Sequence, residues 1–344
     1  MQKKMSRKAK IITAVVAVLV LIPLLLLLGV RAYVRMPHLG YYRASDRVFR
    51  IPGLGDGFIP QGLDYDSARG TYLVTGYDKE GDPSPLYLVG SDGKLQKTLY
   101  YALPDGTPYK GHAGGIAVTG DFVYLAGGED AKVHVFARAD LETTQDGGTL
   151  TAVGALSCYL ENDENDHLGP AFLQVRNNHL VVGEFYRPGN YETPENHYVT
   201  CPSGATQRAL ALCYPLDTAS SIGVATVPTA ALSLPDLAQG IAFSEGRVYV
   251  TGSWALAHSS LSVYDTDKIQ RTQDVTVLGV TIPCYALDDT ALVTRASLPP
   301  MAEEPLILDW KIYVMNESAC NRYYFGKFTG GAHCYATPLT FFEK

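Results

Sequence analysis

Histidine and carboxylate side chains at matching places in repeated segments are the main candidates for chemistry in this 344-residue sequence. His112 and His167 each stand two residues before a glycine, and Glu303 stands two residues after Met301 in a similar segment. Imidazole and carboxylate ligands together suit zinc or another transition metal, so these residues form a possible metal or acid–base site. We favour the alternative that each histidine bonds a backbone carbonyl of a neighbouring loop, because the other three segments carry apolar residues at this place.

No established catalytic motif supports an enzymatic activity. The GxSxG, HExxH and phosphate-loop patterns are all missing from the sequence. Residues 161–166 (ENDEND) offer hard oxygen ligands for calcium, but without the spacing and glycine of an EF-hand loop. A solvated acidic turn is the favoured interpretation. We therefore predict no cofactor, and a divalent metal remains the open alternative.

Five related segments must position the candidate side chains. They cover residues 59–66, 112–120, 167–177, 237–246 and 301–310. Each is followed by a second apolar run, at residues 71–77, 122–128, 179–185, 247–253 and 311–318. Short runs rich in Val, Ile, Tyr and Leu that are separated by turn residues indicate β-hairpins.

A third and a fourth strand follow in most units. The third strands are expected at residues 84–93, 131–140, 209–217, 259–267 and 334–342, and the fourth at 95–104, 151–160, 229–235 and 291–299. The last unit runs out of chain, but residues 46–52 (DRVFRIP) match its missing strand. We expect Val48 and Phe49 to pair beside residues 336–342, which would remove two open sheet edges.

Four-stranded antiparallel units repeated around an axis define a β-propeller. The sequence therefore predicts an all-β, five-bladed β-propeller closed by an N-terminal strand. The extra length of units three and four is assigned to insertions at residues 187–208 and 270–289. With 33 Gly and 20 Pro, the chain is too rich in helix breakers for a helical bundle.

Equivalent positions in the five units should form rings around the central channel. One ring holds Gln61, Gly114, Gly169, Gln239 and Glu303, and another, where the second strands end, holds Tyr77, Gly128, Glu184, Ser253 and Glu317. The predicted ligand-binding side chains at the channel are Gln61, Tyr77, His112, His167, Glu184, Gln239, Glu303 and Glu317. Carboxylates that fix adjacent loops would explain Glu184 and Glu317 equally well. A separate group, Tyr186, Tyr191 and Tyr198, could stack on sugar rings or a peptide.

Four short motifs give the chain a family resemblance. They are Pro60-Gln61-Gly62-Leu63, Gly111-His112-Ala113-Gly114-Gly115, Pro299-Pro300-Met301-Ala302-Glu303, and Glu317-Ser318 with Tyr323. In these motifs, the chain resembles secreted or membrane-anchored bacterial β-propellers of unassigned function, which are distantly similar to strictosidine-synthase and gluconolactonase propellers. The resemblance implies a propeller outside the cytoplasm. The lactonases hold a divalent metal with acidic and Asn residues, and that full set does not match here.

The N-terminal region predicts a membrane anchor. Residues 11–30 are twenty uncharged positions, long enough to cross a hydrocarbon core of about 30 Å as a helix. Five basic residues precede this run and three follow it closely, which favours a cytoplasmic N-terminus. We expect a cytoplasmic tail (1–10), an anchor (11–30), a linker (31–44) and an extracytoplasmic propeller (45–344) in the cell membrane. A cleaved signal peptide is the alternative.

The six cysteines fit an oxidising location. They are even in number and form no CxxC pair, which argues against a zinc ribbon. Disulfides between Cys201 and Cys213 and between Cys320 and Cys334 would each close a short loop and are our first choice. Buried free thiols are the alternative.

The expected function is binding rather than catalysis. The net charge of −7, with basic residues concentrated at the start, leaves no surface for nucleic acid. We predict a membrane-anchored propeller that binds a small ligand or a protein partner at the channel mouth. A metal-assisted hydrolase or lactonase using His112, His167 and Glu303 and a purely structural envelope scaffold are the alternatives.

Overall fold

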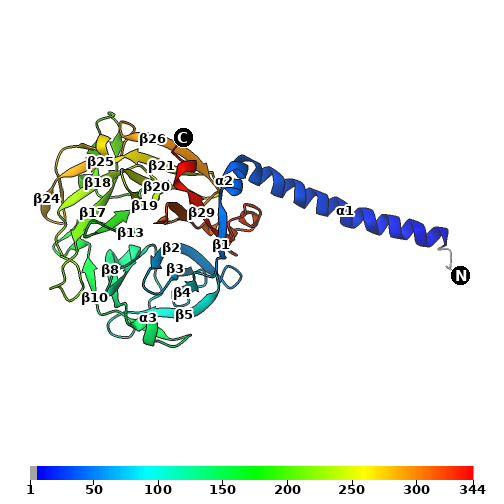
Figure 1. Cartoon of the computed structure of the whole chain (residues 1–344), viewed down its shortest axis with the longest axis horizontal. Helices are drawn as coiled ribbons and strands as arrows, with labels where there is room; N and C mark the ends of the chain where they lie inside the picture. Colours follow the sequence, from blue (N-terminus) through cyan, green and yellow to red (C-terminus); the bar gives the residue numbers. More distant parts are fainter. Residues whose placement is uncertain (1–5, 344) are drawn as a thin grey trace.

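The structure is a computed structural model that describes residues 6–343. Residues 1–5 and 344, and with them Lys3 and Lys4 of the predicted basic tail, lie outside this range. Figure 1 shows sheets arranged as a ring, with one long helix projecting from its rim. The chain is a five-bladed β-propeller, as predicted.

The first two blades follow the predicted strand order. Blade 1 contains β2 (Phe58–Asp66), β3 (Thr71–Asp78), β4 (Pro85–Gly90) and β5 (Leu95–Ala102), with β9 (Thr149–Thr151) added in parallel at its outer edge. Blade 2 contains β6 (Ile116–Val118), β7 (Phe122–Ala126), β8 (Lys132–Ala137) and β10 (Gly154–Ser157).

The next two blades are joined by the insertion in unit four. Blade 3 contains β13 (Pro170–Arg176), β14 (His179–Glu184), β17 (Ala209–Pro215) and β18 (Ala230–Leu234). Blade 4 contains β19 (Ala238–Ser244), β20 (Arg247–Gly252), β21 (Ser259–Asp265) and β26 (Leu292–Leu298). From the insertion, β25 (Cys284–Ala286) pairs in parallel with β18, and β22 (Gln270–Arg271) pairs with β25. The insertion of unit four thus extends the outer edge of blade 3.

Blade 5 closes the ring with both ends of the sequence. It contains β27 (Leu306–Leu308), β28 (Lys311–Val314), β29 (His333–Pro338) and, as its outer strand, β1 (Asp46–Arg50). Phe49 pairs with Cys334, as ring closure requires, but a register shift between Arg47 and Phe49 leaves Val48 outside the regular pairing. The expected partner strand 336–342 is also too long, because the chain turns into the 3₁₀-helix η7 (Leu339–Phe341) after Pro338.

The core is divided between the blades. Five clusters of buried apolar side chains occur in the described chain, and each joins side chains of neighbouring blades. Between blades 5 and 1, for example, Phe49 of β1 packs in the same cluster as Val74 of β3. Because both faces of each sheet are covered, the inner strands consist of nearly continuous apolar residues instead of strict alternation. The loss of one blade would therefore expose the apolar faces of the two neighbouring sheets.

One apolar helix precedes the propeller. Helix α1 (Arg7–Arg35) contains the whole uncharged run, all of it exposed, and could cross a membrane as an anchor; a signal sequence has the same features. A 3₁₀-helix, η1 (Met36–His38), and a short helix, α2 (Leu39–Ala44), connect it to β1. Tyr41 of α2 is buried in the core between blades 4 and 5, so this connection is packed on the propeller.

The two predicted disulfides are wrong, since all six cysteines are free. Cys201 Sγ lies 4.0 Å from Ser233 Oγ, and Ser233 pairs with Leu210 of β17. Cys213 stands three residues further along β17, roughly 10 Å away at 3.3 Å per residue, which is too far for a disulfide. Burial raises the pKa of the Cys213 thiol to about 11.

Candidate functional site

One buried carboxyl group joins four of the five blades. Glu304, which is 1% exposed, precedes β27 and accepts three backbone hydrogen bonds from three other blades. The donors are the amides of Leu63 (3.0 Å), Ile116 (3.0 Å) and Leu173 (2.7 Å). Burial raises the pKa of Glu304 well above its ordinary value, and the three N–H donors partly offset that effect. Glu304 therefore holds blades 1, 2 and 3 to blade 5.

Glycines leave the space that Glu304 occupies. A Cβ on Gly62 would lie 3.0 Å from Glu304 Oε2, and a Cβ on Gly115 would lie 2.7 Å from Oε1. A Cβ on Gly240 would lie 2.7 Å from the Cα of Glu304. These glycines hold the position in their own units that Glu304 holds in the fifth. Three of the other four blades therefore leave out a side chain where the fifth places Glu304, and the third blade has Pro170 at this position.

Three polar side chains, one from β2 and two from other blades, form a hydrogen-bonded row at the channel mouth. His112 Nε2 lies 2.7 Å from Gln61 Oε1, and Gln61 Nε2 donates to Glu317 Oε2 at 3.0 Å. Gln61 also donates to its preceding carbonyl, of Pro60, so its amide orientation is fixed. Because Gln61 Oε1 is an acceptor, His112 Nε2 carries the proton. Burial and Arg322 lower the pKa of His112 to about 4, so its ring is neutral at pH 7.

Aromatic side chains cover this row. The ring centroids of Tyr77 and His112 are 4.4 Å apart, with the planes inclined by 31°. Arg322 donates from Nη1 to the Tyr77 hydroxyl at 2.7 Å, and the Tyr323 hydroxyl donates to Glu317 Oε1 at 3.1 Å. Arg322 and Tyr323 follow the 3₁₀-helix η5 (Glu317–Ala319), so one loop reaches over the mouth.

The second carboxyl group at the mouth is Glu303, which is 2% exposed. Its Oε1 is buried and has no hydrogen-bond partner. Burial, followed by repulsion from Glu317 and Glu304, raises the pKa of Glu303 well above its ordinary value. Burial raises the pKa of Glu317 to about 7. We call Gln61, Tyr77, His112, Glu303, Glu317 and Tyr323 the mouth cluster. It presents two neighbouring acids and no cation of its own.

The other three predicted site residues lie in different surroundings. Gln239 donates to Ser253 Oγ at 3.3 Å within blade 4. Glu184 is buried, and its Oε1 lies 2.7 Å from His197 Nδ1 and accepts from the amide of Leu210 at 2.8 Å. Glu184 therefore ties the insertion of unit three to the end of β14, as the loop-fixing interpretation requires.

The proposed metal ligands do not come together. His167 belongs to β12 (Asp163–His167), which forms a hairpin with β11 (Tyr159–Leu160) before the inner strand of blade 3 begins. His112 bonds the side-chain amide oxygen of Gln61, so this partner is neither a carboxylate nor the backbone carbonyl that we expected. Among residues 6–343, no three or more His, Cys, Asp or Glu side chains form a group that could hold a metal ion. The combination of His112, His167 and Glu303 is therefore wrong as a ligand set.

The acidic segment 161–166 forms the turn and part of the second strand of the β11–β12 hairpin, and residues 161–163 and 165 are exposed, as the solvated-turn interpretation requires. Asp166 is the exception, because it is buried and accepts from the amides of Leu278 at 2.8 Å and Gly279 at 3.2 Å. These amides belong to the turn between β23 (Val275–Val277) and β24 (Val280–Ile282). Asp166 thus joins its hairpin to the insertion of unit four.

The three tyrosines of the unit-three insertion separate into two groups. Tyr186 is buried against Tyr198, and Arg208 lies over both rings. Tyr191 is 54% exposed and contacts Phe185 and Trp254. The single three-tyrosine surface suggested by the sequence is therefore not formed.

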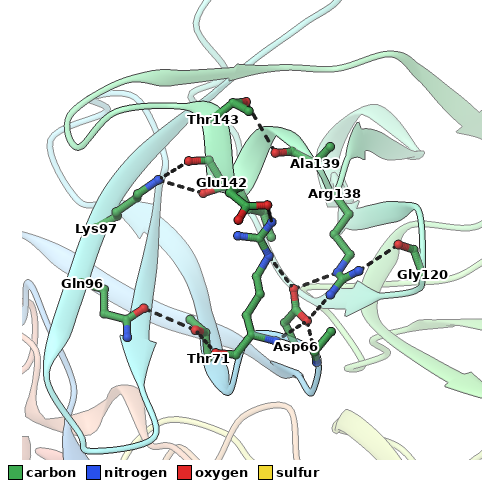
Figure 2. A network of polar contacts seen from close by, with 12 residues as sticks. Asp66, Thr71, Gln96, Lys97, Gly120, Arg138, Ala139, Glu142 and Thr143 are labelled. Atoms are coloured by element: carbon green, nitrogen blue, oxygen red, sulfur yellow. Dashed lines mark hydrogen bonds and ion pairs between the residues drawn. The ribbon is translucent and has the colours of Figure 1, made fainter.

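A polar network lies at the opposite end of β2, away from the mouth. Asp66 forms ion pairs with Arg69 and Arg138, and Arg69 also pairs with Glu142. Figure 2 shows Asp66, Arg138 and Glu142 within this network. Lys97 donates to three carbonyls around the end of α3 (Asp140–Thr143). Arg69, Lys97 and Glu142 border a hollow of about 410 Å³. The ion pairs of Asp66 and Glu142 with the two arginines join blades 1 and 2.

Comparisons with known proteins show distant propeller similarity. No known protein family and no curated protein matches the sequence. Glutaminyl cyclase from Myxococcus xanthus is 12% identical, with a TM-score of 0.43 over 85% of this chain and 94% of the other. A PQQ-bound aldose sugar dehydrogenase from Streptomyces coelicolor is 12% identical, with a TM-score of 0.43 over 85% and 95%. Neither similarity is close enough to carry information about activity.

Proposed function

We propose that the mouth cluster binds a small ligand through a protonated amine. The observation that carries the proposal is the buried Oε1 of Glu303, which has no partner and lies beside a second carboxyl group. A buried polar atom without a hydrogen bond is costly, and two neighbouring acids repel each other when ionised. An ammonium group has three donors and one positive charge, so it would satisfy both requirements.

The surroundings of the two acids also favour a cation over an anion. His112 is neutral at pH 7, and the nearest cation, Arg322, is exposed and directed to the Tyr77 hydroxyl. The electron-rich face of an aromatic ring attracts a cation, and Tyr77 supplies such a ring at the mouth. An anion would meet two carboxyl groups and no buried positive charge.

The membrane is part of the proposal. We infer that α1 stays in the chain as a single-pass anchor, with a cytoplasmic N-terminus and an extracytoplasmic propeller. The excess of basic residues before the apolar run supports this orientation. The ligand would then be captured outside the cytoplasm, close to the cell membrane.

The test is a thermal unfolding series of the full chain in detergent with n-butylamine, and with n-butanol as the uncharged probe. A ligand that binds only the folded chain raises its melting temperature with concentration. We expect the amine, but not the alcohol, to raise it in the native chain, and Glu303→Gln to abolish the effect. Glu245→Gln, at an exposed position, is the matched control.

Two outcomes would count against amine binding. Equal responses to amine and alcohol would show that the carboxyl pair does not select a cation. An amine effect that persists in Glu303→Gln would place the site elsewhere. A purely structural scaffold would show no response to either probe at any concentration.

A further inference from the structure

The loop after η5 carries an exposed aromatic pair beside the end of the apolar helix. Tyr324 and Phe325 are 79% and 69% exposed, and their ring centroids are 5.6 Å apart. Lys327, also exposed, lies in the 3₁₀-helix η6 (Phe325–Phe328) of the same loop. Exposed apolar patches mark interaction sites, and this aromatic pair forms such a patch. We call Tyr324, Phe325 and Lys327 the aromatic foot.

The foot is fixed to the last turn of α1. Arg35 donates from Nε to the carbonyl of Phe328 at 3.0 Å, and the Tyr42 hydroxyl donates to the carbonyl of Thr329. Figure 1 shows this loop (brown) beside α2 and the propeller end of α1. The position of the foot along the helix axis is therefore fixed by its bonds to the end of α1.

The distance between the uncharged run and Arg35 sets the depth of the foot in the membrane. The uncharged run ends at Val30, and Arg35 follows five residues later, about 7.5 Å further along a helix. The polar headgroup region adds roughly 5–7 Å to each side of the hydrocarbon core. If α1 spans the bilayer with the uncharged run in the core, Arg35 and the loop bonded to it lie at headgroup level.

The chemistry of the foot suits this depth. Aromatic side chains concentrate where hydrocarbon meets headgroups, and a lysine stem extends its ammonium group to the anionic surface. Tyr33 of α1 stands three residues beyond Val30 and is 76% exposed, so a second aromatic side chain is available at the same interface. Arg31, also on α1, adds positive charge there.

We propose that the aromatic foot inserts into the headgroup region of the bilayer that holds α1. This inference rests on the proposed retention of α1 as an anchor. The foot gives the propeller a second membrane contact and restricts its rotation about the helix. In the same loop, Arg322 bonds Tyr77 of the mouth cluster and Tyr323 belongs to that cluster, so the membrane contact and the cover of the mouth belong to one segment.

Spin labels on the full chain in vesicles of phosphatidylcholine and phosphatidylglycerol test the proposal. Labels are introduced one at a time by Tyr324→Cys, Phe325→Cys, Leu28→Cys and Val153→Cys, with the half-buried Cys213 replaced by Ser. Leu28 reports the anchor. Val153, which is 50% exposed and directly precedes β10, reports water, since Figure 1 shows β10 on the side of the ring away from α1. Collisions with oxygen increase in lipid, and collisions with a water-soluble nickel chelate decrease.

We expect the oxygen-to-nickel collision ratio at positions 324 and 325 to exceed that at position 153 several-fold and to stay below that at position 28. Ratios at 324 and 325 equal to that at 153, with position 28 in lipid, would overturn the foot while leaving the anchor in place. A water-like ratio at position 28 would overturn the anchor and the foot together. Amine binding at the mouth is measured separately, in detergent, so its failure would not be confused with either result.

Discussion

Glu304, which precedes the inner strand of the last blade, accepts a hydrogen bond from the backbone amide of Leu173 in the third blade at 2.7 Å. The amides of Leu63 and Ile116 bond the same carboxyl group from two further blades. Neighbouring blades of the ring are joined by apolar faces, but this side chain also joins blades that are not neighbours. It fixes the inner strands at the channel mouth, where the mouth cluster is assembled.

Replacing Glu304 by Ala should destabilise the propeller more than most single substitutions. Three buried amides would lose their acceptor, and a loss of about 3–5 kcal/mol in the free energy of unfolding is expected for a broken buried network. Glu304→Gln should cost less, because one carbonyl oxygen remains. Urea unfolding measures both, with Glu245→Gln as the exposed control. A Glu304→Ala chain as stable as the control would show that the three bonds contribute nothing net.

Ring closure should make one side chain of β1 essential. Phe49 is 3% exposed between blades 5 and 1, and Phe→Ala at buried sites costs about 3–5 kcal/mol. Arg47→Ala, on the same strand but exposed, should change stability by less than about 0.5 kcal/mol. A chain that begins at Gly53 should melt well below one that begins at Leu39. Equal melting temperatures for the two truncated chains would contradict closure by β1.

The thiols should be accessible only after unfolding. All six cysteines are free, and five are buried, with Cys213 half-buried. Without a reducing agent, iodoacetamide in concentrated urea should add six groups per chain, which mass spectrometry can count. In the folded chain, modification should be slow even at Cys213, because its raised pKa leaves little thiolate at pH 8. Fewer than six groups in urea would indicate a disulfide.

The repeat pattern was sufficient to predict the blades and most of the mouth cluster. Gln61, Tyr77, His112, Glu303 and Glu317 come together because equivalent positions of successive blades surround one axis. His167 belongs to a separate hairpin, β11–β12, that precedes blade 3, although it stands two residues before a glycine like His112. Equal spacing from a glycine does not ensure equal position where an insertion intervenes.

Other features depended on contacts that the sequence does not reveal directly. Glu304 aligns with Gly62, Gly115 and Gly240 in other units, and one large residue against several glycines could have indicated a side chain on the axis. Arg322 carries no such signal, because its loop has no counterpart in the repeat. The pairing of Cys201 with Cys213 failed because strand register, rather than loop length, decides which thiols meet.

The raised pKa of the buried acid Glu317 at the mouth should make the folded chain less stable as the pH increases. Burial raises the pKa of Glu317 to about 7, above the ordinary value of about 4.3, so the folded chain favours the protonated acid. Stability from this group is complete below about pH 4, falls as the pH rises toward 7, and then stays constant. Asp64, whose pKa burial also raises to about 7, acts in the same direction.

Glu317→Gln should therefore reduce the loss of stability with pH without abolishing it, by on the order of 2 kcal/mol between pH 5 and pH 8. Urea unfolding of the chain that begins at Leu39, at these two pH values, measures the difference. If Glu317→Gln and the native sequence lose the same stability over this interval, then Glu317 is not held as a buried acid beside Glu303, and the amine site loses its physical basis.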